Sequence, residues 1–196
     1  MPILVGLTGS IGMGKTTTAG MFAEAGLPVW DADAAVHRLY GPGGAAVPAI
    51  AAVRPEAVGP EGVDRAALKA WIDQDPAALA RIEAVVHPLV AADRANFIKS
   101  AEASAVVLDI PLLFETGFDR EVDLTVVVST DPDTQRARVL ARPGMTEKRF
   151  DTLLSKQIPD AEKCARADIV ISTDSLDSAR RGVKDVLDRI AELHHA

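Results

Sequence analysis

The chain has 196 residues, of which 48% are hydrophobic, 25% charged and 4% aromatic. This length and composition fit one folded α/β domain with a small insertion, and they argue against a disordered chain or two full domains. The formal net charge of -7 argues against a broad surface for nucleic acid or an anionic membrane, so an anionic ligand must meet a local cluster of cations. A lone cysteine and the lack of an apolar run of about 18 residues lead us to expect a cytoplasmic protein.

A phosphate-binding loop follows the apolar strand predicted at the start of the chain. Gly9 and Gly14 bracket four residues and precede Lys15 and Thr16, which completes the pattern G-x-x-x-x-G-K-[ST]. Together with Gly12, these glycines let successive backbone N–H groups turn inward around phosphate oxygens. Lys15 adds a charge for the outer phosphates, and Thr16 offers a hydroxyl to Mg²⁺. The sequence therefore predicts a site for a nucleotide polyphosphate.

A glycine-rich turn that matches the pattern by chance is the alternative. The motif works only between a strand and a helix. An apolar run at residues 3–7 precedes it, and Ala19, Phe22 and Ala23 follow at helical spacing before Gly26. Both neighbours are present, which favours the phosphate-binding loop.

Two carboxylates follow a short second strand predicted at residues 27–30. Ligands of open parallel sheets bind at the carboxyl ends of the strands, so Asp31 and Asp33 are candidate site residues rather than members of a solvated turn. Asp33 is suited to orient or deprotonate an attacking hydroxyl. Asp31 either caps the next helix, predicted at residues 34–40, or holds water around Mg²⁺.

From residue 41 to about residue 96 the patterns are helical, and we expect no strand there. Four breakers at residues 41–44 separate this part from the preceding helix. The stretch is interpreted as a helical insertion between the second and third strands. Pro88 is expected to begin a new helix, because the residue before a proline disfavours helical angles. A lone histidine such as His87 is more often a packing or capping residue than a site residue.

A buried parallel strand is predicted at residues 105–110, because this continuous apolar run ends beside an acid. Asp109 is a candidate to support Mg²⁺ through water, and the alternative is a cap for a helix expected to begin at Pro111. A fourth strand is predicted at residues 124–128 and a fifth at residues 168–171.

Residues 131–166 carry eight basic and six acidic side chains, a local balance of +2 in a chain of -7. A polar helical pair interrupted by Pro143 and Gly144 indicates a mobile lid. From it, Arg138 and Arg142 are candidates to reach over a bound nucleotide and stabilise transition-state charge. An ordinary solvated helix face is the alternative.

Strands that alternate with helices predict an α/β fold of three layers, a P-loop kinase fold with a five-stranded parallel sheet flanked on both faces. We expect a single domain over residues 1–196. Its parts are a core (1–33, 104–130 and 167–196), a helical substrate-binding insertion (about 34–103) and a helical lid (about 131–166).

Several motifs, in this order, make the chain resemble the dephospho-CoA kinase family over nearly its whole length. They are Gly6-Leu7-Thr8-Gly9-Ser10-Ile11-Gly12-Met13-Gly14-Lys15-Thr16, Asp31-Ala32-Asp33 with His37-Arg38, Gly62-Val63-Asp64-Arg65, His87-Pro88, Pro111-Leu112-Leu113-Phe114-Glu115, and the lid arginines with Lys156-Gln157. The resemblance implies phosphorylation of the ribose 3′-hydroxyl of dephospho-CoA by ATP with Mg²⁺, the last step of coenzyme A biosynthesis.

The resemblance also implies roles for individual residues. Residues 12–17, which include Met13 and Thr17, would take the ATP phosphates, Asp33 would be the base, and Arg142 would lie over the nucleotide. The insertion would bind the CoA moiety. The implied acceptor pocket includes His87, Leu112 and Leu113.

The chain departs from the family pattern at three positions. Ser10 and Met13 stand where Gly and Ser are expected, and Pro143 follows Arg142 where an acid is usual. Because the loop binds through its backbone, we expect Met13 to change only a side chain. Pro143 bears on the geometry of the lid.

Two other functions are compatible with the loop alone. One is a kinase for another small hydroxyl or nucleoside monophosphate acceptor, and the other is a nucleotide switch or binding module. The chain lacks an Asn-Lys-x-Asp motif and an Asp-x-x-Gly switch after a strand, which argues against the switch. We expect ATP and dephospho-CoA as partners and no nucleic acid or membrane. The sequence leaves open whether the chain is a monomer or a weak homo-oligomer, and whether ATP is preferred over GTP.

Overall fold

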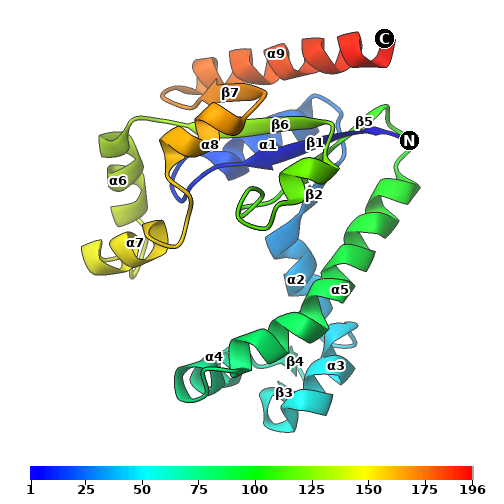
Figure 1. The fold of residues 1–196 in the computed structure, drawn as a ribbon, viewed down its shortest axis with the longest axis vertical. Coiled ribbons are helices and arrows are strands. Elements are labelled where there is room, and N and C mark those ends of the chain that lie inside the picture. The colour runs from blue at the N-terminus through cyan, green and yellow to red at the C-terminus, as the bar shows by residue number, and fades with distance from the viewer. Residues whose placement is uncertain (196) are drawn as a thin grey trace. The chain divides into compact units, whose positions relative to one another are not determined.

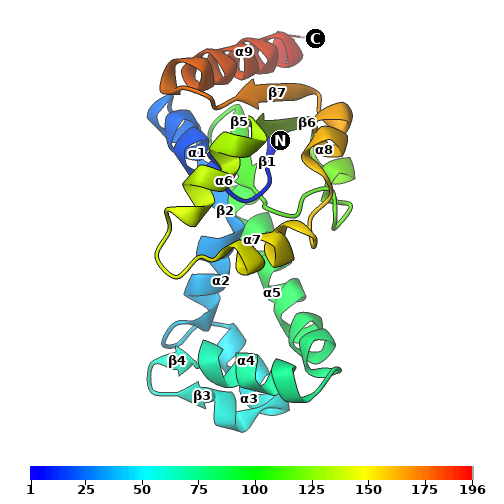
Figure 2. The ribbon, with the colours of Figure 1, turned by 90° about the vertical axis from the view of Figure 1, so that its left-hand side faces the viewer.

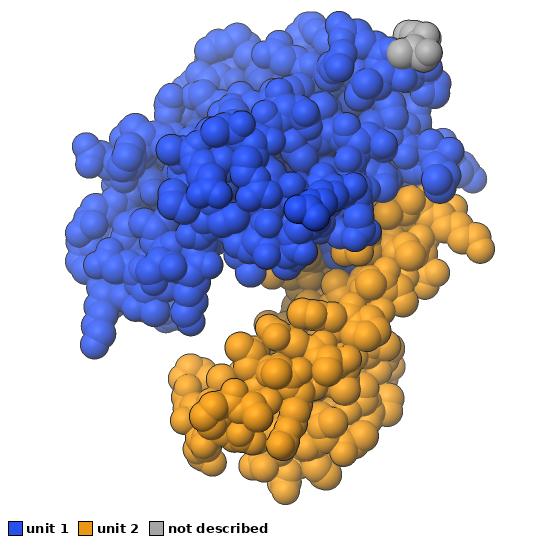
Figure 3. Space-filling view, in the orientation of Figure 1, with its two compact units in different colours: residues 1–30, 101–196 blue, residues 31–100 orange. Residues whose placement is uncertain are grey.

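A computed structural model describes residues 1–195 and divides the chain into two compact units (Figure 3). Residues 1–30 and 101–196 form the first unit, and residues 31–100 form the second. The second unit covers nearly the same stretch as the expected insertion, about residues 34–103.

The first unit contains the large sheet, with elements labelled in Figure 1. They are β1 (Ile3–Thr8), α1 (Lys15–Glu24), β2 (Val29–Asp31), β5 (Ala105–Asp109), the 3-10 turn η2 (Phe118–Glu121), β6 (Leu124–Ser129), α6 (Pro132–Leu140), α7 (Glu147–Leu154), α8 (Asp160–Arg166), β7 (Ile169–Ser172) and α9 (Leu176–His195).

Five strands form this sheet in the order β2-β5-β1-β6-β7. The pairings of β1 with β5, β1 with β6 and β6 with β7 are parallel, which confirms the predicted parallel sheet. In this register Leu7 lies opposite both Asp109 and Val126. The carboxyl end of β1, where the loop begins, is therefore flanked by the ends of β5 and β6.

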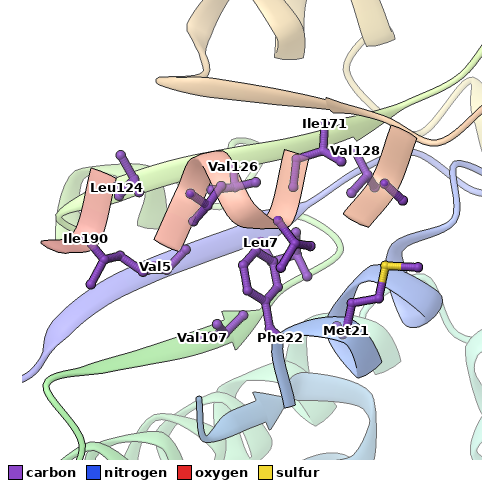
Figure 4. Packing of buried hydrophobic residues seen from close by; sticks show 14 of the residues in the cluster. Val5, Leu7, Met21, Phe22, Val107, Leu124, Val126, Val128, Ile171 and Ile190 are labelled. Carbon is purple, nitrogen blue, oxygen red and sulfur yellow. The ribbon is translucent and has the colours of Figure 1, made fainter. Parts of the chain in front are cut away.

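Both faces of the sheet are buried at its three central strands, β5, β1 and β6. On one face, α1 and α9 pack on alternate residues of the strands, and Figure 4 shows Phe22 of α1 among Val5, Leu7 and Val107. The intervening residues of the strands point to the other face. There a Cβ on Gly6 would lie 3.0 Å from Leu113 and 3.1 Å from Val122, so the segment after β5 covers that side.

The second unit is built around its own apolar cluster, which includes Ile50, Leu68, Trp71 and Ile82. Its elements are α2 (Ala32–Tyr40), α3 (Ala46–Val53), the 3-10 turn η1 (Pro55–Ala57), β3 (Val58–Gly59), β4 (Gly62–Val63), α4 (Arg65–Gln74) and α5 (Ala78–Ser100).

The antiparallel pair β3–β4 contradicts the expectation that this stretch holds no strand. Each strand has two residues, which is too short to produce an alternating pattern. Residues 60–61 turn the chain between the two strands, and β4 begins at Gly62, whose φ of 95° is a left-handed angle that favours glycine.

The expected helix start at Pro88 was also wrong, because α5 runs through it from Ala78 to Ser100. Proline removes one hydrogen bond to the carbonyl four residues earlier, that of Ala84. Ala84 and Pro88 are both exposed, so water can satisfy that carbonyl and the helix continues.

The two longest helices, α5 and α9, have 23 and 20 residues and carry charged side chains along their length. Over residues 1–195, no helix combines the length and apolar character needed to cross a bilayer.

We expect Phe22→Ala to lower the free energy of unfolding by about 3–5 kcal/mol, because Phe22 is fully buried between α1 and the sheet. Urea unfolding followed by circular dichroism measures this change. Leu176→Ala is the control, since Leu176 is 57% exposed and its loss should stay within about 0.5 kcal/mol. Similar losses in the two variants would contradict the packing described.

Candidate functional site

The loop between β1 and α1 has the shape of an anion-binding nest. Gly12 and Gly14 both take left-handed angles, with φ of 83° and 87°. Gly14 precedes the first residue of α1, and no side chain caps that helix end. The first N–H groups of α1 are therefore available to a ligand, and the helix dipole favours a negative charge there.

Two glycines are required by close approach of other segments. A Cβ on Gly9 would lie 2.4 Å from a methyl group of Val128 and 2.8 Å from its carbonyl oxygen, in β6. A Cβ on Gly12 would lie 2.5 Å from Val139 of α6 and would also strain the left-handed backbone. Any side chain at either position would displace the loop from its neighbours.

Lys15 and Asp109, predicted from separate motifs, form an ion pair in the structure. Asp109 ends β5 and is only 2% exposed, whereas Lys15 is the first residue of α1 and is partly exposed. The carboxylate thus holds the ammonium group beside the loop, where a ligand phosphate can reach it. Of the two roles considered for Asp109, capping is excluded by the structure after β5.

No helix begins at Pro111, contrary to expectation. Residues 111–117 form turns, in which the Thr116 N–H donates to the Leu112 carbonyl at 3.0 Å. Gly117 then takes a left-handed conformation with φ of 73°, and this ends the helical turn before it can extend.

Thr16 and Asp109 fit a metal ion that is bound together with a nucleotide. Thr16 lies exposed in the first turn of α1. In the described part of the chain, no three His, Cys, Asp or Glu residues are grouped to hold a metal by themselves. Mg²⁺ commonly keeps several waters and takes few protein ligands alongside phosphate oxygens, so a hydroxyl and a nearby carboxylate are a suitable donor set.

Asp31 and Asp33 lie at the start of α2 in the second unit. Asp31 caps the helix, with its Oδ1 accepting the Ala34 N–H at 2.9 Å, which is one of the two roles considered for it. Asp33 is exposed in the first turn of the same helix. The metal role of Asp31 and the base role of Asp33 remain predictions.

Met13 connects the loop to two distant segments, through its side chain and through its backbone carbonyl, so it does more than change a side chain as we expected. It is buried, and its Sδ accepts the Thr130 N–H at 3.3 Å. The Met13 carbonyl accepts the Thr173 hydroxyl at 2.7 Å. Sequence reasoning had no signal for these contacts, because Thr130 and Thr173 lie 117 and 160 residues away.

The two lid arginines differ in their surroundings. Arg138 lies on α6 and Arg142 lies just after it, in the stretch before α7; both helices are labelled in Figure 2. Arg138 is half-buried and donates to the Thr173 hydroxyl at 3.2 Å and to its carbonyl at 2.7 Å. It thereby supports the residue that holds Met13. Arg142 lies exposed just after the end of α6. Nucleotide contacts of both arginines remain predictions.

The predicted acceptor residues are dispersed between the two units. His87 is exposed on α5 in the second unit. In the first unit, Leu112 is 41% exposed, whereas Leu113 is fully buried and packs over Gly6. Of these two leucines, Leu112 therefore presents a side chain to solvent and Leu113 belongs to the core.

The family model and the curated relatives that match this chain share one name. A family model described as dephospho-CoA kinase matches residues 3–178. The dephospho-CoA kinase of Cereibacter sphaeroides is 55% identical over 191 residues, which cover 97% of this chain and 97% of that protein. That of Ruegeria pomeroyi is 56% identical over 190 residues, which cover 97% of this chain and 96% of that protein. The crystal structure of TT1252 from Thermus thermophilus gives a TM-score of 0.83 at 36% identity, covering 96% of this chain and 97% of that chain.

The ion pair of Lys15 with Asp109 predicts separate effects on stability and turnover. Lys15→Ala should lower the free energy of unfolding by roughly 3 kcal/mol, because the buried carboxylate loses its lysine partner. The double variant Lys15→Ala/Asp109→Asn should recover much of that stability, since the negative charge of Asp109 is then removed together with the lysine. Turnover should stay several orders of magnitude low in both variants, because the phosphates lose their cation.

Urea unfolding and steady-state kinetics on the single and double variants provide the measurement. Lys184→Ala is the control, because it breaks an exposed ion pair on α9 and should cost less than about 1 kcal/mol. If the double variant were no more stable to unfolding than Lys15→Ala, the loss of stability would not come from the unpaired charge of the Asp109 carboxylate.

Proposed function

The chain belongs to the dephospho-CoA kinase family, and we propose that it transfers the terminal phosphoryl group of ATP to the ribose 3′-hydroxyl of dephospho-CoA. The products are coenzyme A and ADP. The observation that carries this function is an identity of 55% with a relative of that name over nearly the full length of both chains. The phosphate-binding nest with its paired Lys15 and Asp109 supports it independently.

The donor side of the reaction rests on the loop of this P-loop kinase fold. Backbone N–H groups of residues 12–17 bind the phosphates of ATP, and Lys15 neutralises charge on the outer ones. A Mg²⁺ ion bound with ATP would supply further neutralisation of the phosphate charge. Thr16 and Asp109 are the residues that would hold it, and Asp31 is a further candidate through water.

Four residues are assigned to the acceptor side of the reaction. Asp33 orients the 3′-hydroxyl of dephospho-CoA and accepts its proton, while His87 and Leu112 contribute to binding of the acceptor. Leu113 is fully buried, so its part in the acceptor pocket is limited to packing behind it. Phosphoryl transfer through a loose transition state needs an oriented hydroxyl more than a strongly basic one. Asp33 is exposed in the first turn of α2, where an acceptor hydroxyl can reach its carboxylate.

Arg142 and Arg138 add positive charge from the lid once the nucleotide is bound. The exposed Arg142 is free to swing over the phosphates. Arg138 adds its charge from beside the loop, because it is hydrogen-bonded to Thr173, which itself contacts Met13 of the loop. We assign the reaction to the cytoplasm, where ATP-dependent biosynthesis takes place.

Incubation of the protein with ATP, Mg²⁺ and dephospho-CoA tests the function directly. Mass spectrometry should find coenzyme A, which is dephospho-CoA with one added phosphate, and NMR should place that phosphate on the ribose 3′ position. A panel with adenosine, shikimate and a nucleoside monophosphate as acceptors should give little ADP release. Faster ADP release with another acceptor than with dephospho-CoA would overturn the assignment.

Asp33→Asn should lower turnover by ~10²–10⁴-fold, the range for loss of a general base, while the affinity for Mg²⁺-ATP barely changes. Calorimetry gives the affinity, and turnover is measured against Mg²⁺ concentration. Asp177→Asn is the control, because Asp177 is likewise in the first turn of a helix, α9. Weaker Mg²⁺-ATP binding with rescue by added Mg²⁺ would make Asp33 a metal ligand instead.

Arg142→Ala should lower turnover about 10- to 1,000-fold, because the transition state loses a cation. Limited proteolysis within residues 136–156 should slow when ATP is added to the wild-type protein and slow less in the variant. Arg180→Ala, which removes an exposed arginine from α9, is the control. Unchanged kinetics in Arg142→Ala would show that Arg142 belongs to an ordinary solvated surface and has no role in the reaction.

A further inference from the structure

Two glutamines from opposite ends of the lid hold one residue of the phosphate-binding loop. Nε2 of Gln135, on α6, donates to the Ile11 carbonyl at 2.8 Å. The Ile11 N–H donates to Oε1 of Gln157, between α7 and α8, at 3.0 Å. Neither glutamine has a role in the reaction described above, and the separations of 124 and 146 residues hide the arrangement from sequence patterns.

The chemistry of Ile11 fixes the direction of both side-chain amides. A backbone N–H can only donate, and a backbone carbonyl can only accept. Gln157 must therefore present its oxygen to Ile11, and Gln135 must present its amide hydrogen. The two residues are of the same type, but Gln135 acts as a hydrogen-bond donor and Gln157 as an acceptor.

The Gln157 end is anchored by a buried ion pair. The N–H of the next residue, Ile158, donates to Oε1 of Glu115 at 2.9 Å. Nζ of Lys163 on α8 lies 2.8 Å from the same oxygen, and the Lys163 side chain is fully buried. One helical turn later, Arg166 pairs with Asp119 at 3.1 Å, so α8 is held on the segment after β5 at two points.

The Gln135 end is anchored by packing on the loop itself. Gln135 is 5% exposed. Its backbone carbonyl would lie 3.0 Å from a Cβ on Gly12, and Val139, one turn further along α6, would lie still closer. Both anchors are thus docked in the first unit, and the part of the lid between them, residues 136–156, is connected to the loop at Ile11 from both sides.

We propose that Gln135 and Gln157 are positioning residues that hold Ile11 and thereby keep the phosphate-binding loop in its nest conformation, coupling it to the lid. Losing either hydrogen bond reduces the fraction of molecules with a competent loop, and the apparent affinity for ATP falls by the same factor. Ile11 is partly buried, and an unsatisfied hydrogen-bonding group there costs enough for a change of about 10-fold. The choice of ATP as ligand rests on the proposed function.

Matched glutamate variants test the opposite roles of the two amides. In Gln157→Glu the carboxylate can still accept the Ile11 N–H. In Gln135→Glu an acceptor replaces the donor and faces the Ile11 carbonyl. Both variants add one negative charge beside the same residue, so the difference between them reports the hydrogen bond. Gln74→Glu is the control, because Gln74 is the one remaining glutamine of the three in the chain and is exposed at the end of α4.

Calorimetry with ATP and Mg²⁺, without any acceptor, is the main measurement. We expect Gln135→Glu to bind ATP at least about tenfold more weakly than Gln157→Glu, and Gln74→Glu to match the wild type. Gln157→Met, which loses the acceptor without adding charge, should also bind about tenfold more weakly than the wild type. ATP should still slow proteolysis at residues 136–156 in Gln157→Glu and should no longer do so in Gln157→Met.

Equal ATP affinities in the two glutamate variants would overturn the proposal, because charge alone would then explain the effect. A lower melting temperature with unchanged ATP affinity in Gln157→Met would likewise overturn it and leave a purely structural contact. Should Gln135→Glu fail to fold, Gln157→Met against Gln157→Glu decides the question by itself.

Turnover gives a second readout. The KM for ATP should rise about tenfold in Gln157→Met while the KM for dephospho-CoA is unchanged. An absence of any phosphorylated dephospho-CoA from the wild-type protein would overturn the proposed function, whereas the calorimetric comparison at Ile11 would still decide this inference.

Discussion

Close approach of the backbone at Gly9 and Gly12 is the constraint on which the site depends. At Gly9 the missing Cβ lets β6 lie against the loop, and at Gly12 it lets α6 do the same. The nest is therefore enclosed by β6 and α6 before any nucleotide binds. Such preorganisation reduces the cost of ordering the loop when the phosphates arrive. Met13, Thr173 and Arg138 extend the same enclosure behind the loop.

Two buried or partly buried ion pairs in the first unit serve different ends. Asp109 is buried but its partner Lys15 is partly exposed, so the lysine is oriented by the protein and remains within reach of a ligand phosphate. Lys163 is fully buried with Glu115 and cannot reach a ligand. Burying charge is costly unless it is paired, which makes the pairing of Lys163 a strong restraint on how α8 sits on the segment after β5. The first pair orients a partly exposed lysine beside the loop, and the second holds α8 on the segment after β5.

The errors in the sequence-based fold share one physical cause. We predicted a helix start at Pro88 and another at Pro111 from local preference alone. In the structure neither helix begins there, because of the surroundings of each proline. The exposed side of α5 tolerates the lost hydrogen bond at Pro88, and Gly117 ends the turn that Pro111 begins. The strands β3 and β4 are too short to show any period. Local propensity is a weak prior of this kind, because packing and solvent exposure contribute energies of similar size.

The sequence by itself determined the nest, the lysine and threonine that follow it, the five strands and the place of Asp109. Each of these depends on neighbours within a few residues, or on an apolar run that can only be buried. The tertiary structure alone decided that Lys15 pairs with Asp109, that Met13 joins two distant threonines, and that Gln135 and Gln157 meet at Ile11. These contacts join residues 94 to 160 positions apart. No local pattern encodes them, because they exist only once the parallel crossovers have brought the ends of the strands together.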